Sequence, residues 1–197
     1  MDDNDDTIII GEDTKYPIEV SVYAFKGTVE TTTEHNMRFA IKMINLDEQA
    51  LVPIMFVYTE DKMFVLPLSV KLAEDTKLSA AEQVIPLLKV FKNNEDKTGK
   101  IIGYQVIFEA WMGRAKITES DKFLKNYKYG DIAKMEQKIE AIVNVVNLNK
   151  KELKTEIYEI QKLESDKKVT VKKLDKRFDM PSANPKFPNF KDVKGEY

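Results

Sequence analysis

Two glutamates, Glu109 and Glu140, come nearest to a catalytic arrangement in this chain. Each lies in a run of alternating apolar and polar residues, which is the pattern of a β-strand. If the two strands are adjacent and antiparallel, the carboxylates come within the several ångströms that glycoside hydrolysis requires of its two acidic residues. However, a chain with 33 acidic residues produces such pairs by chance, and a buried acid usually meets a basic partner such as Arg114 or Lys138. A hydrolase that uses Glu109 and Glu140 is therefore the third of three functional hypotheses.

Few residues remain for other kinds of catalysis or for metal binding. The chain has no cysteine, which excludes disulfides, thiolate metal sites and cysteine nucleophiles. His35 is the only histidine, and its place near a predicted helix start is typical of a surface residue. There are 7 glycines and no phosphate-binding loop of the Walker or dinucleotide type. We predict no catalytic residue, no cofactor and no metal site, and the residues favour a protein that is not an enzyme.

Charge and hydrophobicity indicate an ordinary water-soluble domain. The net charge of −2, from 31 basic and 33 acidic residues, gives no field that would attract nucleic acid or an anionic membrane. No segment approaches the roughly 18–20 uninterrupted apolar residues of a membrane helix. The aspartate-rich start is also unlike a secretory signal, which begins with positive charge. We expect a cytoplasmic protein with no membrane partner.

The stretch 100–112, KIIGYQVIFEAWM, positions Glu109 and gives the strongest structural signal in the sequence. Every second residue from Ile102 onward is apolar, and this period of two indicates a core strand. The other face is apolar in part, through Ile107 and Trp111. A strand that is apolar on both faces is predicted to lie in the middle of its sheet.

The remaining elements follow from changes in the hydrophobic period, because alternation predicts strands and spacings of three and four predict helices. Polar residues at Glu60, Asp61 and Lys62, between two apolar runs, indicate a tight hairpin. Pro86 within a helical pattern predicts a kink or an interruption. In chain order, the predicted elements are a strand within 16–30, a helix over 34–49 capped by Thr32 or Thr33, paired strands within 51–70, a helix within 71–92 capped by Thr76 or Ser79, the strand 100–112, and strands over 137–148 and 153–163.

This element order predicts a single α+β domain over residues 16–163. We expect a mostly antiparallel sheet of about five to seven strands, with two helices packed on one face. The last strand, 153–163, shows a slip in its alternation that indicates a bulge. Its alternating glutamates and lysines indicate an edge that faces water.

Both ends of the chain are predicted to be flexible extensions of the domain. Residues 1–15 form an acidic arm, although Ile8–Ile10 can instead add an edge strand to a partner or to this chain's own sheet. Residues 164–197 form a tail rich in lysine and proline that cannot bury enough apolar surface to fold alone. The alternative for the tail is a docking peptide that inserts into a neighbouring protein. Its candidate docking residues are Phe187, Pro188 and Phe190.

The polar connection 113–135 contains the strongest candidate for nucleic-acid contact. Within 113–129, arginine and lysine residues alternate with Phe123, Tyr127 and Tyr129. Basic residues can hold a nucleic-acid backbone while aromatic rings stack on bases. The same composition is typical of a solvated lysine-rich loop, and neighbouring acidic residues dilute the charge. A nucleic-acid-associated protein is therefore the second functional hypothesis.

Two short motifs resemble a family of small uncharacterised proteins from bacteria and their phages. They are FEAWM at 108–112 and KIEAIV at 138–143, separated by a polar spacer. Members of that family carry an E-A-W strand, a polar loop that ends in a basic-x-Glu triplet, and a following strand. The resemblance covers roughly residues 72–163, although a lysine stands where the family usually has arginine and the Asp-Pro pair before it is missing. The motif residues, whose role the resemblance leaves unknown, are Glu109, Trp111, Lys138 and Glu140.

The favoured hypothesis is a non-enzymatic phage or mobile-element protein that acts through protein–protein contacts, for example as a virion or assembly component. Charged or aromatic extensions at both ends of a compact domain support it, as does the lack of a catalytic constellation. We expect a protein partner or a homo-oligomer. Nucleic-acid binding through 113–129 and the lysine-rich tail is the alternative.

Overall fold

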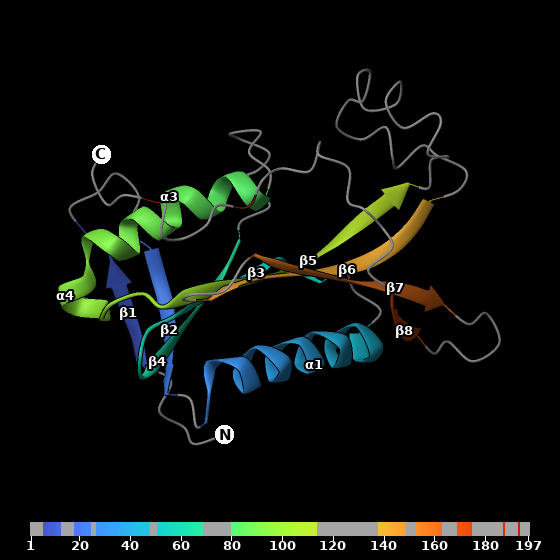
Figure 1. Cartoon of the computed structure of the whole chain (residues 1–197), viewed down its shortest axis with the longest axis horizontal. Helices are drawn as coiled ribbons and strands as arrows, with labels where there is room; N and C mark the ends of the chain where they lie inside the picture. The colour runs from blue at the N-terminus through green and yellow to red at the C-terminus, as the bar shows by residue number, and fades with distance from the viewer. Residues whose placement is uncertain are drawn as a thin grey trace.

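The computed structural model describes residues 6–12, 18–24, 27–47, 51–68, 80–113, 138–148, 153–162 and 169–174, together with Phe187 and Val193. This part of the chain contains eight strands and three helices (Figure 1). The strands are β1 (Asp6–Ile10), β2 (Ile18–Ala24), β3 (Ile54–Tyr58), β4 (Lys62–Pro67), β5 (Gly103–Gly113), β6 (Lys138–Leu148), β7 (Lys154–Lys162) and β8 (Val169–Lys173). The helices are α1 (Val29–Asp47), α3 (Ala80–Asn93) and the short α4 (Glu95–Thr98).

All eight strands form one sheet in the order β1-β2-β4-β3-β5-β6-β7-β8. Every neighbouring pair is antiparallel. The predicted α+β class with an antiparallel sheet is therefore confirmed, as are the hairpin that joins β3 to β4 and the central position of β5. The sheet is larger than the predicted five to seven strands. The additional strands are β1 and β8. Because β1 pairs with β2 at the edge of the sheet, the alternative that Ile8–Ile10 adds an edge strand to this chain's own sheet is confirmed. The strand β8 lies in the segment 164–197, which we predicted to be a flexible tail.

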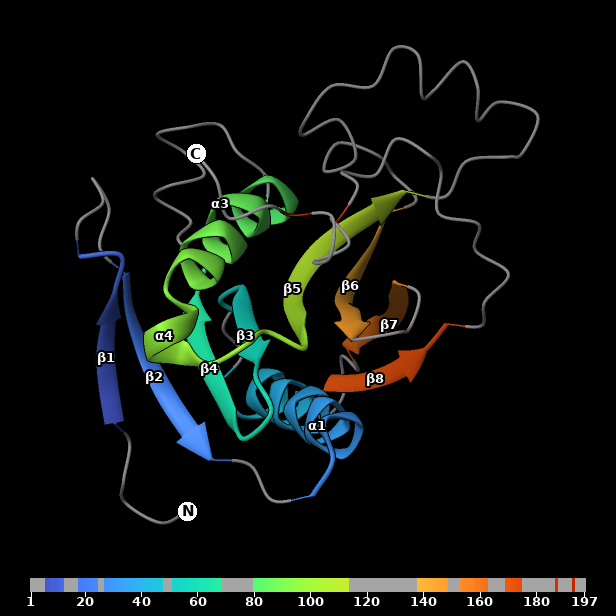
Figure 2. The ribbon, with the colours of Figure 1, turned by 60° about the vertical axis from the view of Figure 1, so that its left-hand side comes forward.

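The two long helices cover opposite faces of the sheet (Figures 1 and 2). One core cluster joins α3 to residues such as Phe64 and Val106, and a second joins α1 to residues such as Ile107 and Ile142. The prediction that both helices pack on one face is therefore wrong. The physical reason is that the central strands bury apolar side chains on both faces of the sheet, so each face needs a helix to cover it.

The start of α1 shows how local hydrogen bonds set a helix boundary. The backbone N–H of Thr31 donates to Thr28 Oγ1, and the backbone N–H of Thr28 donates to Thr31 Oγ1, each at 3.2 Å. This reciprocal pair is a capping box, which satisfies two N–H groups that lack helical partners. The predicted start at residue 34, with Thr32 or Thr33 as the cap, is therefore too late.

The second long helix, α3, continues through Pro86 without the predicted interruption. Pro86 lies on the exposed side of α3, where backbone groups near a helical proline are accessible to water. The predicted caps Thr76 and Ser79 lie outside the described residues.

The strand β7 is not the edge that its alternating charges predicted, because β8 pairs with it from Tyr158 to Lys162. The predicted bulge is also absent from the described pairing, since the register between β6 and β7 runs without interruption from Ala141 opposite Glu159 to Val146 opposite Lys154. Some of the charges instead line a cleft next to α1.

The first residue of β5, Gly103, sits where two strand backbones come close together. A Cβ atom on Gly103 would lie 2.5 Å from the carbonyl oxygen of Asn147 and 2.9 Å from the Cα of Leu148. Both are backbone atoms of β6, which is held on its other side by β7. Only glycine fits this position without moving the central strands.

We expect Gly103→Ala to lower the free energy of unfolding by about 1–3 kcal/mol, because the added methyl group must push two paired strands apart. Urea denaturation of the variant and the wild type measures the difference. An unchanged denaturation midpoint would show that β5 and β6 can separate here at no cost.

Candidate functional site

The candidate site begins at a buried polar side chain in the middle of the sheet. Gln105 on β5 is fully buried, and all its hydrogen-bonding capacity is used. Its Oε1 accepts from Tyr58 Oη at 2.7 Å and from Asn36 Nδ2 at 3.2 Å. Its Nε2 donates to the Thr33 carbonyl at 3.0 Å and to Asn144 Oδ1 at 2.9 Å. One amide thus connects α1, β3, β5 and β6.

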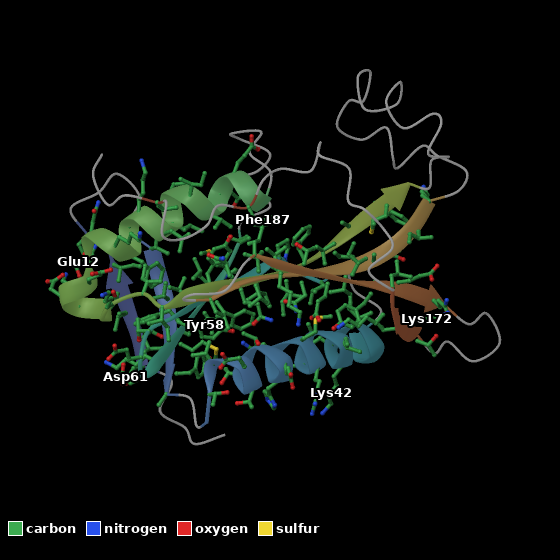
Figure 3. The ribbon with its side chains drawn as sticks, in the orientation of Figure 1. Glu12, Lys42, Tyr58, Asp61, Lys172 and Phe187 are labelled. Atoms are coloured by element: carbon green, nitrogen blue, oxygen red, sulfur yellow. The ribbon has the colours of Figure 1, made fainter. Side chains whose placement is uncertain are left out.

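Asn36 and Tyr58, the latter labelled in Figure 3, complete this network between α1 and the sheet. Asn36 Nδ2 also donates to Tyr58 Oη at 3.0 Å. Burial raises the pKa of Tyr58 above its usual range, so the phenol stays protonated and remains the donor to Gln105. Buried polar groups in a network of this kind are stable only when every member has a partner.

The network continues outward from Asn144 to Glu156, which accepts hydrogen bonds from three strands. Asn144 Nδ2 and Tyr158 Oη reach Glu156 Oε2 at 3.1 and 3.2 Å. Lys154 Nζ lies 3.0 Å from Glu156 Oε1, and Lys173 Nζ from β8 donates to the same oxygen. The carboxylate side chain is only 13% exposed, so these partners replace most of its hydration.

Three of these groups have shifted pKa values. Burial alone would raise the pKa of Glu156, but hydrogen bonds from Lys173 and Lys154 outweigh it and lower the pKa to about 2. The hydrogen bond to Glu156 raises the pKa of Lys173. Burial, followed by the negative charge of Glu156, raises the pKa of Tyr158. At neutral pH the carboxylate and the ammonium are therefore charged and the phenol is neutral.

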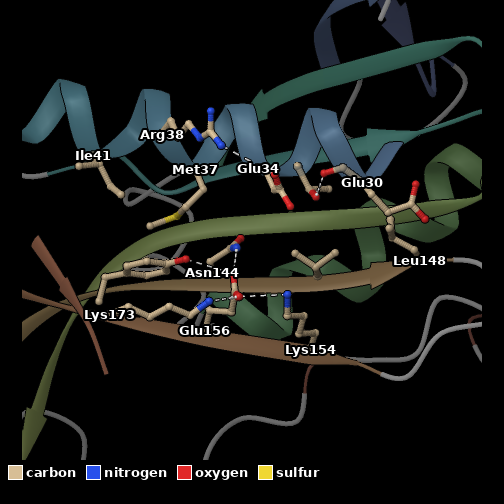
Figure 4. Close-up of a pocket in the computed structure, with 13 residues that line it drawn as sticks. Glu30, Glu34, Met37, Arg38, Ile41, Asn144, Leu148, Lys154, Glu156 and Lys173 are labelled. Carbon is tan, nitrogen blue, oxygen red and sulfur yellow. Dashed lines mark hydrogen bonds and ion pairs between the residues drawn. The ribbon is translucent and has the colours of Figure 1, made fainter. Parts of the chain in front are cut away.

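These groups form one wall of a cleft of about 550 Å³ between α1 and strands β6 to β8, which we call the α1 cleft (Figure 4). Side chains of α1 point toward the strands across it. The cleft is lined by Glu30, Thr33, Glu34, Met37, Arg38, Ile41, Asn144, Val146, Leu148, Lys154, Glu156, Tyr158 and Lys173. Its apolar side chains come from both α1 and β6, and side chains with charges of both signs surround them. Arg38 and Glu34 form an exposed pair at 3.9 Å on the α1 side.

The four motif residues lie outside the α1 cleft, where the C-terminal end of β5 pairs with the N-terminal end of β6. The strand register places Trp111 opposite Glu140 and Gly113 opposite Lys138. Lys138 Nζ lies 4.7 Å from the centre of the Trp111 ring, and this cation–π contact joins the two strands. Trp111 is 45% exposed.

Glu109 and Glu140 share a face of the sheet as diagonal neighbours, since Glu109 lies opposite Ile142. Their strands are adjacent and antiparallel, as the hydrolase hypothesis requires. Glu109 Oε2 accepts the backbone N–H of Leu51 at 3.0 Å, which gives this carboxylate a structural role. Catalysis by the pair stays a prediction.

Of the predicted docking residues, only Phe187 lies in the described part of the chain. Its ring packs on Phe108 of β5, with centroids 5.8 Å apart, next to the core under α3 (Figure 3). Val193 is buried in the same cluster, and Lys92 Nζ donates to its carbonyl. Two residues of the predicted tail, Phe187 and Val193, thus contact this chain's own domain. Pro188 and Phe190 lie outside the described residues.

The predicted nucleic-acid segment 113–129 lies outside the described residues, apart from Gly113 at the end of β5. Of the lysine pairs in the tail, Lys172 and Lys173 are in β8, and Lys173 is bound to Glu156. His35 is on an exposed position of α1, as predicted.

The described residues contain neither a cluster of metal ligands nor a membrane-spanning helix. They contain no group of three or more histidine, aspartate or glutamate side chains arranged to hold a metal ion. No helix among them is both long and apolar enough to cross a membrane. Comparison of the chain with protein-family models, with curated proteins and with solved structures found no match.

The sequence contains signals for the α1 cleft that hydrophobic periodicity alone does not reveal. Lys154, Glu156 and Tyr158 are spaced by two residues and so share one face of a strand. Asn144 interrupts an otherwise apolar run, as does Gln105 in β5. A polar amide inside a buried strand needs a buried partner, and two such amides on neighbouring strands indicate a network.

We expect Tyr58→Phe to lower the free energy of unfolding by about 1–2 kcal/mol, because Gln105 loses a donor and Asn36 loses an acceptor in the core. A double-mutant cycle with Asn36→Ala, followed by urea denaturation, separates this coupling from other effects. Additive effects of the two substitutions would contradict a shared network.

We expect acid to destabilise the protein through Glu156. The folded pKa of about 2 lies below the ordinary value of 4.5, so this stabilisation is complete above about pH 5 and is lost as the pH falls toward 2. The shift is worth about 3 kcal/mol. Urea denaturation at pH 5 and near pH 2 should show a smaller loss of stability in Glu156→Gln than in the wild type.

The matched control is Glu159→Gln, which changes a glutamate on the opposite face of the same strand. This variant should keep the pH dependence of the wild type. Equal acid sensitivity in Glu156→Gln and the wild type would contradict the assignment.

Proposed function

We propose that the protein is a non-enzymatic binding protein that acts through protein–protein contacts, and that the α1 cleft receives a segment of its partner. The observation that carries this proposal is the protonation state of the cleft. The pKa of Glu156 is lowered to about 2, and those of Lys173 and Tyr158 are raised. All three pKa values are thus moved further from neutral pH.

These shifts support binding over catalysis at the cleft. A general acid or base works best when its pKa lies near the operating pH. Here the carboxylate holds its negative charge and Lys173 holds its proton, so neither exchanges a proton readily at pH 7. Fixed charges of this kind are suited to orienting a ligand.

The lining of the cleft supports a protein segment as the ligand. Three acidic side chains (Glu30, Glu34 and Glu156) are matched by three basic ones (Arg38, Lys154 and Lys173) around an apolar floor. A polyanion such as nucleic acid requires a basic excess, which this lining does not offer. A polypeptide presents apolar side chains and charges of both signs, and the volume of about 550 Å³ is within the usual range for ligand sites.

The finer form of the proposal is a phage or mobile-element protein that serves as a virion or assembly component. It rests on the resemblance of the 108–112 and 138–143 motifs and not on the cleft. The α1 cleft supports only the wider proposal of a protein partner.

A displayed library of random twelve-residue peptides tests the cleft directly. We expect the wild type to enrich peptides that combine an apolar residue with charges of both signs. Arg38→Glu should weaken binding of the enriched peptides by at least about tenfold, measured by fluorescence anisotropy, because it reverses a charge at the cleft.

The matched control is Lys42→Glu, which makes the same change of charge on α1. Lys42 is exposed and points away from the sheet (Figure 3), so this variant should bind the peptides as the wild type does. Failure to enrich any peptide, or equal losses in both variants, would contradict the proposal. Tight, salt-sensitive binding of mixed-sequence single-stranded DNA would favour the nucleic-acid hypothesis instead.

A further inference from the structure

Within the described part of the chain, the sheet has an open edge at each end of its strand order. Among these residues, β1 pairs only with β2, and β8 pairs only with β7. The two strands lie at opposite ends of the sheet in Figure 2. An open edge presents backbone donors and acceptors that another strand can pair with. On β1 the apolar side chain of Ile9 is also 49% exposed.

The number of strands makes the two edges geometrically compatible. Because all neighbours in the eight-stranded sheet are antiparallel, β1 and β8 run in opposite directions. A second copy placed beside the first in the same orientation therefore brings its β1 antiparallel to β8 of the first. The α3 faces of both copies then lie on the same side of the joined sheet.

The charges of the two edges are opposite. β1 begins with Asp6, after three further aspartates in the first five residues, and β8 ends with Lys172 and Lys173. In an antiparallel joint the start of one strand lies beside the end of the other. The acidic end of β1 therefore meets the basic end of β8.

The two charged side chains that would meet across the joint also lie on the same face of the sheet. Asp6 lies on the same face of β1 as Ile8 and Ile10, which pack under α3. Val171 packs toward α1, so its neighbour Lys172 lies on the opposite face of β8, the face that α3 covers. Asp6 and Lys172 thus belong to the same face, and they lie directly opposite each other in the register that places Thr7 against Val171.

Pairing of like edges would bring like charges together. In a twofold β1–β1 joint centred on Thr7, the two copies of Asp6 are diagonal neighbours on one face. In a twofold β8–β8 joint centred on Val171, the two copies of Lys172 are diagonal neighbours. Such neighbours on one face repel when their charges are alike, so each edge discourages pairing with itself.

We propose that copies of this chain associate head to tail, with β1 of one copy pairing antiparallel with β8 of the next through Asp6 and Lys172. Because the joint is not twofold symmetric, it generates a ring if the rotation closes and a filament if it does not. Each joint involves two five-residue strands, so a single joint is weak and the assembly depends on concentration and salt.

Sedimentation velocity of the full chain, from about 10 μM to 1 mM in 50 mM and 500 mM NaCl, tests this proposal. We expect the sedimentation coefficient to rise with concentration and to fall with salt. Asp6→Lys and Lys172→Glu should each reduce association by about tenfold. An equimolar mixture of the two variants should restore it, because the lysine introduced on β1 then meets the glutamate introduced on β8. Asp61→Lys and Lys42→Glu, at exposed sites outside β1 and β8 (Figure 3), are the matched controls.

Three results would overturn the proposal. The first is a wild type that stays monomeric over the whole range at low salt. The second is unchanged association of Lys172→Glu, which would show that β8 takes no part in the joint. The third is a mixture that associates no more than its separate components while circular dichroism shows that both variants are folded.

Discussion

The structure depends on the burial of one neutral amide in an otherwise apolar sheet. Gln105 uses two acceptor and two donor positions, and each partner comes from a different place: the Asn36 side chain, the Thr33 carbonyl, Tyr58 and Asn144. Leaving any of these groups unpaired in the core would cost about 1–3 kcal/mol. Apolar contacts tolerate small slips of a helix along a sheet, whereas this set of bonds does not. The amide therefore fixes where α1 lies relative to β3, β5 and β6.

The position of α1 in turn determines the α1 cleft. Asn144 bonds to Gln105 on one side and to Glu156 on the other, so the charged wall is an extension of the core network. Glu156 is held by groups from three strands. A side chain anchored in this way is already in place before any ligand arrives, which reduces the entropy cost of binding.

The local sequence pattern was sufficient to predict β5, from its alternation, and the β3–β4 hairpin, from the polar residues between two apolar runs. At the ends of the chain, the local pattern left β1 as one of two alternatives and missed β8. Each of these strands is only five residues long and is stabilised by pairing with the strand next to it in the chain. The local pattern also failed for the helices, since periodicity shows which side of a helix is apolar but not which face of a sheet it covers. The cleft was missed for a related reason. Lys154 and Glu156 resemble solvated charges when they are considered alone, and their role depends on Lys173 from β8 and on α1 above them.

The position of β8 has a consequence for local unfolding. This strand is short, has one neighbour in the described sheet and contributes Lys173 to the carboxylate of Glu156. Short edge elements open at a lower free energy than central strands do. Detachment of β8 would remove one of the two ammonium groups at Glu156 while the network around Gln105 stays intact. A buried polar network and a short edge strand thus meet at a single carboxylate.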